Sequence, residues 1–172
     1  MIIRDVCVQD ASQLLAIYTP YVLNTAISFE YEAPSLQEFE GRIRSITATF
    51  PYLAAEEDGQ IIGYAYAAPY HPRKAFMISA EASIYLDPRF HRKGVGHALY
   101  RELERRLTTM GITNLYALIA YTPADDPYLP RDSVYFHEKM GFTLVGHLHQ
   151  CGLKFGRWYD MYYMEKIIAP HT

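Results

Sequence analysis

The sequence predicts a single α+β domain, built on a mixed but largely antiparallel sheet with helices on both of its faces. Half of the 172 residues are apolar, which is enough for one sizeable core. Strand-like segments dominate the first half of the chain, and a strand–helix–strand order follows in the second half, as in mixed sheets. Because no internal repeat, low-complexity tract or linker divides the chain, residues 1–172 are expected to form one domain.

The N-terminal part is expected to alternate extended and helical segments. Residues 2–6 form a short apolar strand, and Asp10 has the side chain of an N-cap for the helix that follows it. Pro20 is expected to interrupt or kink that helix, because proline lacks the N–H that a helix interior needs. Residues 26–34 alternate in polarity and are expected to be extended.

Two local motifs define the next elements. Ser35 and Glu38 have the spacing of a capping box, which opens a helix toward Ile46. The turn pair Asp58-Gly59 lies between two apolar runs and predicts a hairpin. The later elements follow in chain order: a strand over 76–86, a helix over 94–111, a buried strand over 114–121, a loop over 122–130, a short helix over 132–141 and two strands over 142–150 and 158–167.

The composition argues against several classes of protein. Sixteen basic and nineteen acidic residues give a formal net charge of −3, whereas nucleic-acid-binding domains carry an excess of Lys and Arg. No segment approaches the roughly 20 apolar residues of a membrane helix, and the first residues do not resemble a signal peptide. The two cysteines are too few for a disulfide scaffold. We therefore expect a cytoplasmic protein without a nucleic-acid or membrane partner.

A glycine-containing turn after the strand at 76–86 predicts a site for an anion. Gly94 and Gly96 lack a Cβ, so a ligand can come close to the backbone at the start of the helix. Arg92 and Lys93 add positive charge at the same place. This pattern favours a pyrophosphate site; glycines that only turn the chain are the alternative.

The segment HLHQC contains three side chains that can bind a metal ion. On a regular strand, His147, His149 and Cys151 share one face. Positions four apart on a strand are separated by about 13 Å, too far for one tetrahedral ion. The sequence therefore predicts no metal. It also contains neither the C-x-x-C pair nor the Ser-His-Asp order that would indicate redox or hydrolase chemistry.

Several segments carry a resemblance to a known family. The stretch SIYLDPRFHRKGVGHALY resembles the acetyl-CoA motif of the GNAT acetyltransferases, with His91 in place of the usual Gln or Arg. The stretch FHEKMGF is similar to the signature of the family's fourth helix. Three further stretches resemble the beginning, centre and end of the phosphinothricin acetyltransferase subfamily: IYTPYVLNTAISFEYEAPS, RKAFMISAEASIYL and GLKFGRWYDMYYME.

The resemblance implies the GNAT fold, direct use of acetyl-CoA without a metal, and a homodimer. It also implies a small amino-acid-like acceptor of the phosphinothricin or methionine sulfoximine type. Another amine, such as an ordinary amino acid, a polyamine or a protein N-terminus, is the alternative acceptor. A non-catalytic sensor that binds acyl-CoA is the alternative from a different class of protein.

Acetyl transfer to an amine needs a base, because the amine is protonated at neutral pH. Glu81 lies mid-strand among small and apolar residues, where a carboxylate is costly unless it is used or paired. The alternation places it on one face with Ser83 and Tyr85. The resemblance also puts Glu81 at the position of the subfamily's catalytic glutamate. A structural ion pair or an exposed edge position is the alternative.

The resemblance implies that acetyl-CoA binds along the end of this strand and the start of the next helix. The backbone of Ile84, Tyr85 and Leu86 is expected to bind the pantetheine arm, and one amide to polarise the thioester carbonyl. Ser133 is a further expected cofactor neighbour. The residues expected at the pyrophosphate are Arg92, Lys93, Gly94, Val95, Gly96 and His97.

His137 and four other residues complete the expected site. His137 holds the position where many GNAT relatives have a tyrosine thought to protonate the CoA thiolate, although packing in the core is the alternative role. Arg73, with Phe76 nearby, is expected to grip an anionic group of the acceptor through its guanidinium. Phe29 and Glu30 are expected to line the acceptor pocket, with strand packing and a surface charge as their alternatives.

Overall fold

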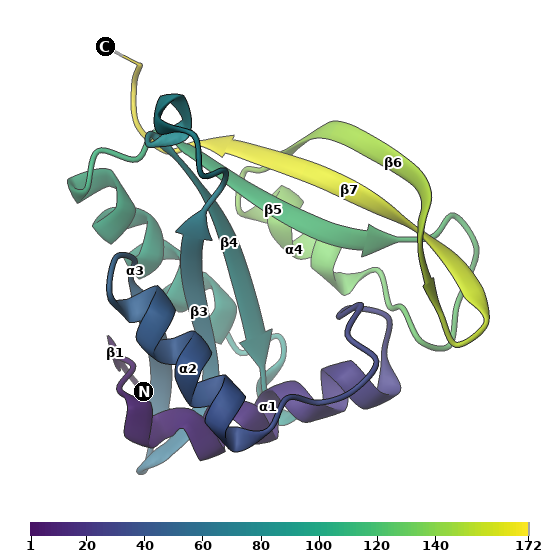
Figure 1. The fold of residues 1–172 in the computed structure, drawn as a ribbon, viewed down its shortest axis with the longest axis horizontal. Helices are drawn as coiled ribbons and strands as arrows, with labels where there is room; N and C mark the ends of the chain where they lie inside the picture. The colour runs from purple at the N-terminus through teal and green to yellow at the C-terminus, as the bar shows by residue number, and fades with distance from the viewer. Residues whose placement is uncertain (172) are drawn as a thin grey trace.

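The computed structural model describes residues 1–171 and shows one mixed sheet of seven strands (Figure 1). The strand order is β1-β2-β3-β4-β5-β7-β6, and the pairing is antiparallel everywhere except between β4 and β5. The predicted α+β class and mixed sheet are confirmed. The strands are β1 (Ile2–Asp5), β2 (Tyr52–Glu57), β3 (Gln60–Pro69), β4 (Ser79–Leu86), β5 (Asn114–Tyr121), β6 (Thr143–Lys154) and β7 (Arg157–Ile167).

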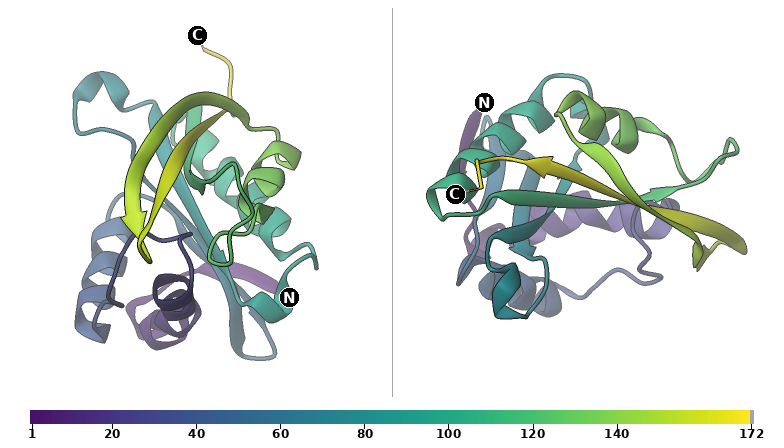
Figure 2. Two further views of the ribbon diagram at one scale, coloured as in Figure 1. Left: turned by 90° about the vertical axis from the view of Figure 1, so that its right-hand side faces the viewer. Right: turned by 90° about the horizontal axis from the view of Figure 1, so that it is seen from above.

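Four α-helices cover the two faces of the sheet, α1 and α2 on one side and α3 and α4 on the other (Figure 2). They are α1 (Ala11–Asn24), α2 (Leu36–Thr47), α3 (Val95–Thr109) and α4 (Asp132–Lys139). The period-two alternation of the strands supplies both cores. In β2, for example, Leu53 and Ala55 pack toward α3, whereas Tyr52 and Ala54 pack toward α1 and α2.

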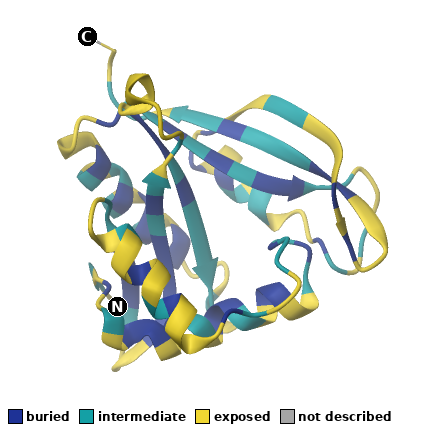
Figure 3. Cartoon of the chain, in the orientation of Figure 1, coloured by how far each residue is buried: buried dark blue, intermediate teal, exposed yellow. Residues whose placement is uncertain are grey.

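Burial divides each helix into a buried stripe and an exposed stripe (Figure 3). In α3, Leu99, Leu103 and Leu107 are fully buried on the sheet, which is the spacing that the sequence predicts. The Ser35–Glu38 capping box starts α2 as expected, because the Glu38 N–H donates to Ser35 Oγ and the Ser35 N–H donates to the Glu38 carboxylate.

Two features of the N-terminal part differ from what the sequence predicts. Pro20 does not interrupt α1, which continues to Asn24. The turns on both sides of Pro20 bury Ile17, Tyr18, Tyr21 and Val22 in the core, and this packing outweighs the missing hydrogen bond.

Residues 26–34 form no strand, although Ala26 and Ser28 are buried as the alternation indicates. The segment crosses from α1 to α2 without joining the sheet. A smaller difference concerns β4, which begins at Ser79 after a 3-10 turn at Lys74–Phe76, while the sequence predicts a strand from 76.

Among residues 1–171, none of the helices combines the length and the apolar character that crossing a bilayer requires.

Candidate active site

A cleft opens between β4 and β5 where these parallel strands separate. Their pairing is limited to residues 79–81 against residues 114–116, and Figure 1 shows the two strands diverging beyond that point. The cleft is lined by residues 82–85 of β4, residues 117–120 of β5 and side chains from α3 and α4. A parallel sheet that splits in its middle leaves main-chain donors and acceptors without strand partners, which an extended ligand can satisfy.

The direction of the main-chain groups along β4 follows from its pairing with β3. The Asp87 N–H donates to the carbonyl of Ile62 on β3, at 3.0 Å. Because main-chain bonds of an antiparallel pair alternate, the N–H and C=O of Tyr85 also face β3, whereas those of Ile84 and Leu86 face the cleft. Ile84 and Leu86 can therefore offer backbone groups to a ligand, while Tyr85 contributes its side chain to the α1 side of the sheet.

The Leu86 carbonyl also ties the end of β4 to α1. The Tyr21 hydroxyl donates to this carbonyl at 2.6 Å. Since that bond uses the only proton of the hydroxyl, the contact of 3.1 Å between Tyr21 Oη and His91 Nε2 has the imidazole as its donor. His91, the residue that departs from the family motif, thus fixes the turn against α1.

The turn before α3 has the geometry of an anion site. Gly94 is the N-cap of α3 with φ of +83°, and nothing lies within 4 Å of the place where its Cβ would be. The first N–H groups of α3, including those of Val95 and His97, have no partner within the helix. Arg92 and Lys93 are exposed beside them.

Gly96 has a packing role that the motif does not indicate. A Cβ at Gly96 would lie 3.0 Å from the ring of Phe136 on α4, and the residue is buried. Its missing side chain lets α3 and α4 pack closely. Of the two glycines, only Gly94 borders open space.

Glu81 lies at the point where β4 and β5 part, as the last residue of β4 that pairs with β5. Its neighbours place it on the sheet face that also carries Ser83 and Tyr85, as the alternation predicts. Within residues 1–171, no side chain forms a hydrogen bond or ion pair with the Glu81 carboxylate. Burial raises the pKa of this carboxyl above its usual range. The structural ion pair considered as an alternative therefore finds no cation in the described chain.

His137 is buried, and both of its ring nitrogens are engaged. Nδ1 lies 2.7 Å from the Ser133 carbonyl, and Nε2 lies 2.8 Å from the Tyr100 hydroxyl. Because a carbonyl can only accept, Nδ1 carries the proton and Nε2 accepts from Tyr100. Burial lowers the pKa of His137 to about 4, so the ring is neutral at neutral pH. His137, Tyr100 and Ser133 all line the cleft.

The residues expected at the acceptor come from two separate parts of the molecule. Arg73 and Phe76 lie in the connection that precedes β4, whereas Phe29 and Glu30 lie in the segment after α1. Arg73 is exposed in the connection from β3 to β4, close in sequence to Glu81, and forms no ion pair within residues 1–171. Phe76 packs with Tyr70, their ring centroids 5.7 Å apart. The guanidinium of Arg73 is thus available to an anion from solution.

Phe29 and Glu30 make internal contacts. The Phe29 ring packs on Tyr159 and over Gly152, where a Cβ would collide with it. Glu30 accepts from the Tyr18 hydroxyl at 2.7 Å and pairs with Arg42. The charge of Glu30 is therefore already compensated by its neighbours.

Lys154 is a structural residue that the sequence reasoning missed. Its ammonium group is buried and donates to three main-chain carbonyls, those of Val22, Thr25 and Ser28, at 2.6, 2.8 and 2.6 Å. These carbonyls belong to the C-terminal end of α1 and the segment after it, where cations are favoured. Lys154 thereby ties the β6–β7 hairpin to the segment that carries Phe29. A charged residue within GLKFGRW is the only signal in the sequence.

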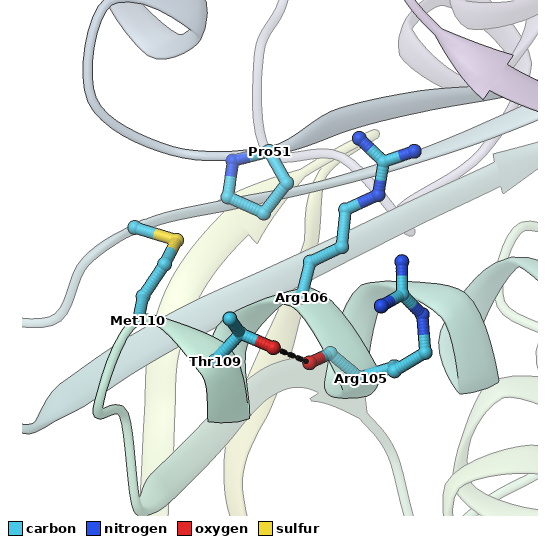
Figure 4. Close-up of a pocket in the computed structure, with 5 residues that line it drawn as sticks. All are labelled: Pro51, Arg105, Arg106, Thr109 and Met110. Carbon is cyan, nitrogen blue, oxygen red and sulfur yellow. Dashed lines mark hydrogen bonds between the residues drawn. The ribbon is translucent and has the colours of Figure 1, made fainter.

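A second hollow lies at the far end of α3 and is open to solvent (Figure 4). Its lining contains no carboxylate, histidine or cysteine among the described residues, and consists of Pro51, Arg105, Arg106, Thr109 and Met110. The side chains of Arg105 and Arg106 are both bound to Glu102. We therefore place the chemistry in the cleft between β4 and β5.

A strand with one open edge, beside a helix start that attracts anions, suits an extended anionic thioester. Such a site is characteristic of acyltransferases that use acyl-CoA. The chain matches the acetyltransferase (GNAT) domain family over residues 3–163 and therefore belongs to it.

Individual relatives agree with this assignment. The chain is 30% identical to a phosphinothricin N-acetyltransferase of Streptomyces viridochromogenes, over 95% of this chain and 86% of the relative. It is 31% identical to an L-methionine sulfoximine/L-methionine sulfone acetyltransferase of Pseudomonas paraeruginosa, over 98% and 95%.

The fold is also shared with a solved structure that contains acetyl-CoA. A GNAT superfamily phosphinothricin acetyltransferase from Sinorhizobium meliloti in complex with AcCoA matches with a TM-score of 0.87 and 35% identity, covering 96% of this chain and 87% of that chain. The chain is thus an N-acetyltransferase of the GNAT type, and acetyl-CoA is its co-substrate.

Proposed function

We propose that the chain acetylates the amino group of a small amino-acid-like acceptor of the phosphinothricin or methionine sulfoximine type. The observation that carries the proposal is Glu81, a half-buried carboxylate without a cationic partner in residues 1–171, at the point where β4 and β5 separate. The names of the two relatives described above supply the acceptor class.

Residues of β4 and α3 would hold acetyl-CoA, which supplies an acetyl group activated as a thioester. The backbone groups of Ile84 and Leu86 that face the cleft would bind the pantetheine arm, and one amide would polarise the thioester carbonyl. The first N–H groups of α3, with Arg92 and Lys93, would bind the pyrophosphate. The open space at Gly94 fits such a ligand, since no atom of the chain fills it.

Glu81 would act as the general base. It accepts a proton from the ammonium form of the acceptor, directly or through water, so that the amine can form a C–N bond with the acetyl carbon. The C–S bond breaks in the same transfer, and its electron pair leaves on the sulfur. The nitrogen loses a second proton as the amide forms, and this proton ends on the CoA thiolate. The raised pKa of Glu81 makes it a stronger base than an ordinary carboxylate.

Tyr100 and His137 would together stabilise the negative charge that develops on the leaving sulfur. The N–H of neutral His137 is committed to the Ser133 carbonyl, so this ring has no proton ready for the thiolate. The Tyr100 hydroxyl, which donates to His137 in the resting site, can instead turn its proton toward the sulfur as negative charge develops. His137 would then be a positioning residue for Tyr100.

On the acceptor side, Arg73 would bind the carboxylate or phosphinate of the acceptor, with Phe76 and Phe29 as apolar walls. Glu30 would act indirectly, through its ion pair with Arg42. We also propose a homodimer in the cytoplasm. Exposed apolar side chains on the β6–β7 hairpin support the dimer: Leu144, Val145, Leu148, Leu153 and Trp158.

An acceptor screen tests this proposal. The protein is incubated with acetyl-CoA and a set of amines that contains phosphinothricin, methionine sulfoximine, an ordinary amino acid, a polyamine and a peptide with a free N-terminus. Thiol release is followed, and the products are identified by mass spectrometry. The highest kcat/KM is expected for the first two amines. A preference for the peptide or polyamine would overturn the acceptor class, and no thiol release with any amine would favour an acyl-CoA sensor.

A further inference from the structure

A second cluster of chemically active side chains lies on the β6–β7 hairpin, outside the lining of the cleft. It consists of His147 and His149 on β6 and Asp160 on β7, whose potential ligand atoms all lie within 4.8 Å of one another. The His147 Nε2 atom is 2.6 Å from Asp160 Oδ2, and the His149 Nδ1 atom is 3.8 Å from the same oxygen.

An irregularity in β6 creates this cluster. The register between β6 and β7 shifts between Leu148 and Gly152, so that residues 149–151 form a bulge opposite Asp160. Gln150 in the bulge has a φ of +46°, a backbone conformation that residues other than glycine rarely adopt. The bulge turns His149 beside His147, and their ring centroids are 3.9 Å apart.

Asp160 is oriented as a metal-binding carboxylate would be. Its Oδ1 accepts the main-chain N–H of Gln150 at 2.8 Å, which leaves Oδ2 directed at the two imidazoles. Asp160 is buried, and within residues 1–171 neither Lys nor Arg pairs with it. A divalent cation between the carboxylate and the two imidazoles would compensate the negative charge of Asp160.

We propose that His147, His149 and Asp160 bind a divalent transition-metal ion of the Zn²⁺ class, with water at an open fourth position. Two imidazoles and one carboxylate suit Zn²⁺ and its neighbours, whereas Mg²⁺ and Ca²⁺ prefer oxygen ligands only. Ligand atoms about 3.3 Å apart surround a tetrahedral Zn²⁺ with bonds of about 2.0 Å, so shifts on the order of 1 Å assemble the site. The His149 side chain is 75% exposed, which leaves an entry path from solvent.

The geometry offers a third ligand that the sequence argument against a metal in HLHQC did not include. That argument placed the third ligand at Cys151 on the same strand, about 13 Å from His147. The structure instead offers Asp160 from the neighbouring strand, which no local spacing reveals. The ordinary alternative is a His147–Asp160 hydrogen bond that stabilises the hairpin without any ion.

Zinc binding by the whole chain distinguishes these two possibilities. Protein stripped with a chelator is titrated with Zn²⁺ against a competing indicator, and the thermal midpoint is measured with and without the ion. We expect about one Zn²⁺ per chain and a higher midpoint when it is bound. Co²⁺ in place of Zn²⁺ should give the intense visible absorption of a four- or five-coordinate site.

Two variants and two controls make the result decisive. His149→Ala removes an exposed ligand that forms no bond with the sheet core, so it should fold normally and lose the binding, while Asp160→Asn should lose it as well. Cys151→Ala and His171→Ala, which lack a place in the cluster, should bind Zn²⁺ as the unaltered chain does. Absence of binding by the unaltered chain, or equal binding by His149→Ala, would overturn the proposal. Acetyl transfer is measured separately and does not decide it.

Discussion

The two sides of the cleft are built in different ways. The donor side, where acetyl-CoA is proposed to bind, is one continuous stretch of the chain, residues 79–100. It consists of β4, the glycine turn and the start of α3, and its features follow from the local sequence. The acceptor side combines the segment after α1, the connection from β3 to β4, and the β6–β7 hairpin. Two of these parts, the segment after α1 and the hairpin, are joined by contacts such as Lys154 to Val22, which are 132 residues apart in the chain. Local patterns therefore describe the donor side well and the acceptor side poorly.

The largest effect is expected at Glu81, where the donor side meets the acceptor. Glu81→Gln keeps the shape and removes the base, so kcat should fall by roughly a hundredfold or more at neutral pH, with normal acetyl-CoA binding. Since burial raises the pKa of Glu81, kcat/KM of the unaltered chain should decline on acidification at a higher pH than an ordinary carboxylate near pH 4.3 would cause. Steady-state rates from acid to alkaline pH provide the measurement.

Alkaline pH offers a check on this assignment, because the acceptor then loses its proton without help. The rate of Glu81→Gln should recover in part as pH rises. A variant with most of the original rate and an unchanged pH profile would place the base elsewhere.

Lys154 tests the acceptor side. Lys154→Met keeps the length of the side chain but leaves three main-chain carbonyls without their shared donor, which should lower the free energy of unfolding by about 3 kcal/mol. The KM for the acceptor should rise more than the KM for acetyl-CoA, because the loosened segment carries Phe29. Denaturant unfolding and two-substrate kinetics measure both effects. Equal changes in the two KM values would mean that the hairpin supports both sides of the cleft alike.

How far the fold could be predicted depends on how local each signal is. The capping box at Ser35, the turn at Asp58-Gly59 and the strand at 114–121 were correct, since each depends on neighbouring residues. The prediction for residues 26–34 fails because alternate residues are buried both in a strand and in a segment held by Lys154. The helix continues through Pro20 because tertiary packing outweighs the local cost of the proline.

In the candidate site, too, features set by neighbouring residues could be predicted, whereas features set by contacts between elements could not. The anion-binding geometry at Gly94 and the shared face of Glu81, Ser83 and Tyr85 agree with expectations from motif and alternation. The direction of main-chain groups along β4, which separates Tyr85 from Ile84 and Leu86, depends on the pairing with β3 and could not be read from the strand itself. The Tyr100–His137 contact joins two helices and has no signal in either one.

Arg73 tests whether the acceptor side recognises an anionic group. Arg73→Ala should reduce kcat/KM for anionic acceptors by about one to two decades, or roughly 1.5–3 kcal/mol, and should affect a simple amine much less. Lys74→Ala is the matched control, since Lys74 is an equally exposed cation next to it. If both acceptor classes lose equally, Arg73 supports the fold or the co-substrate instead.

The two glycines of the turn separate binding from packing on the donor side. Gly94→Val places a side chain in the proposed anion site at a φ of +83°, so the KM for acetyl-CoA should rise about tenfold. Gly96→Ala pushes against Phe136 and should lower the thermal midpoint with little change in that KM. Kinetics and thermal unfolding of both variants check this. An unchanged KM in Gly94→Val would refute the anion site.

The smallest effect on turnover is expected from the Tyr100–His137 pair. Tyr100→Phe removes one hydroxyl, and kcat should fall about fivefold, as for the loss of one hydrogen bond of about 1 kcal/mol. Acetyl-CoA binding should be nearly unchanged, because the ring remains packed on Phe136. A kcat equal to that of the unaltered chain would leave the pair with a packing role only, which is the alternative considered for His137.

The pH dependence of stability gives His137 an independent readout. Its pKa is about 4 in the folded chain and 6.5 in its ordinary state, so between these values the unfolded chain binds more protons. The contribution of neutral His137 to stability is therefore complete above pH 6.5 and is lost as the pH falls toward 4. His137→Gln should flatten this part of the curve of unfolding free energy against pH, while Tyr100→Phe should retain its slope. The same slope in His137→Gln would show that the ring titrates normally in the fold. Below pH 6.5, Tyr100 would then face an imidazolium donor rather than the neutral acceptor inferred from the two ring contacts.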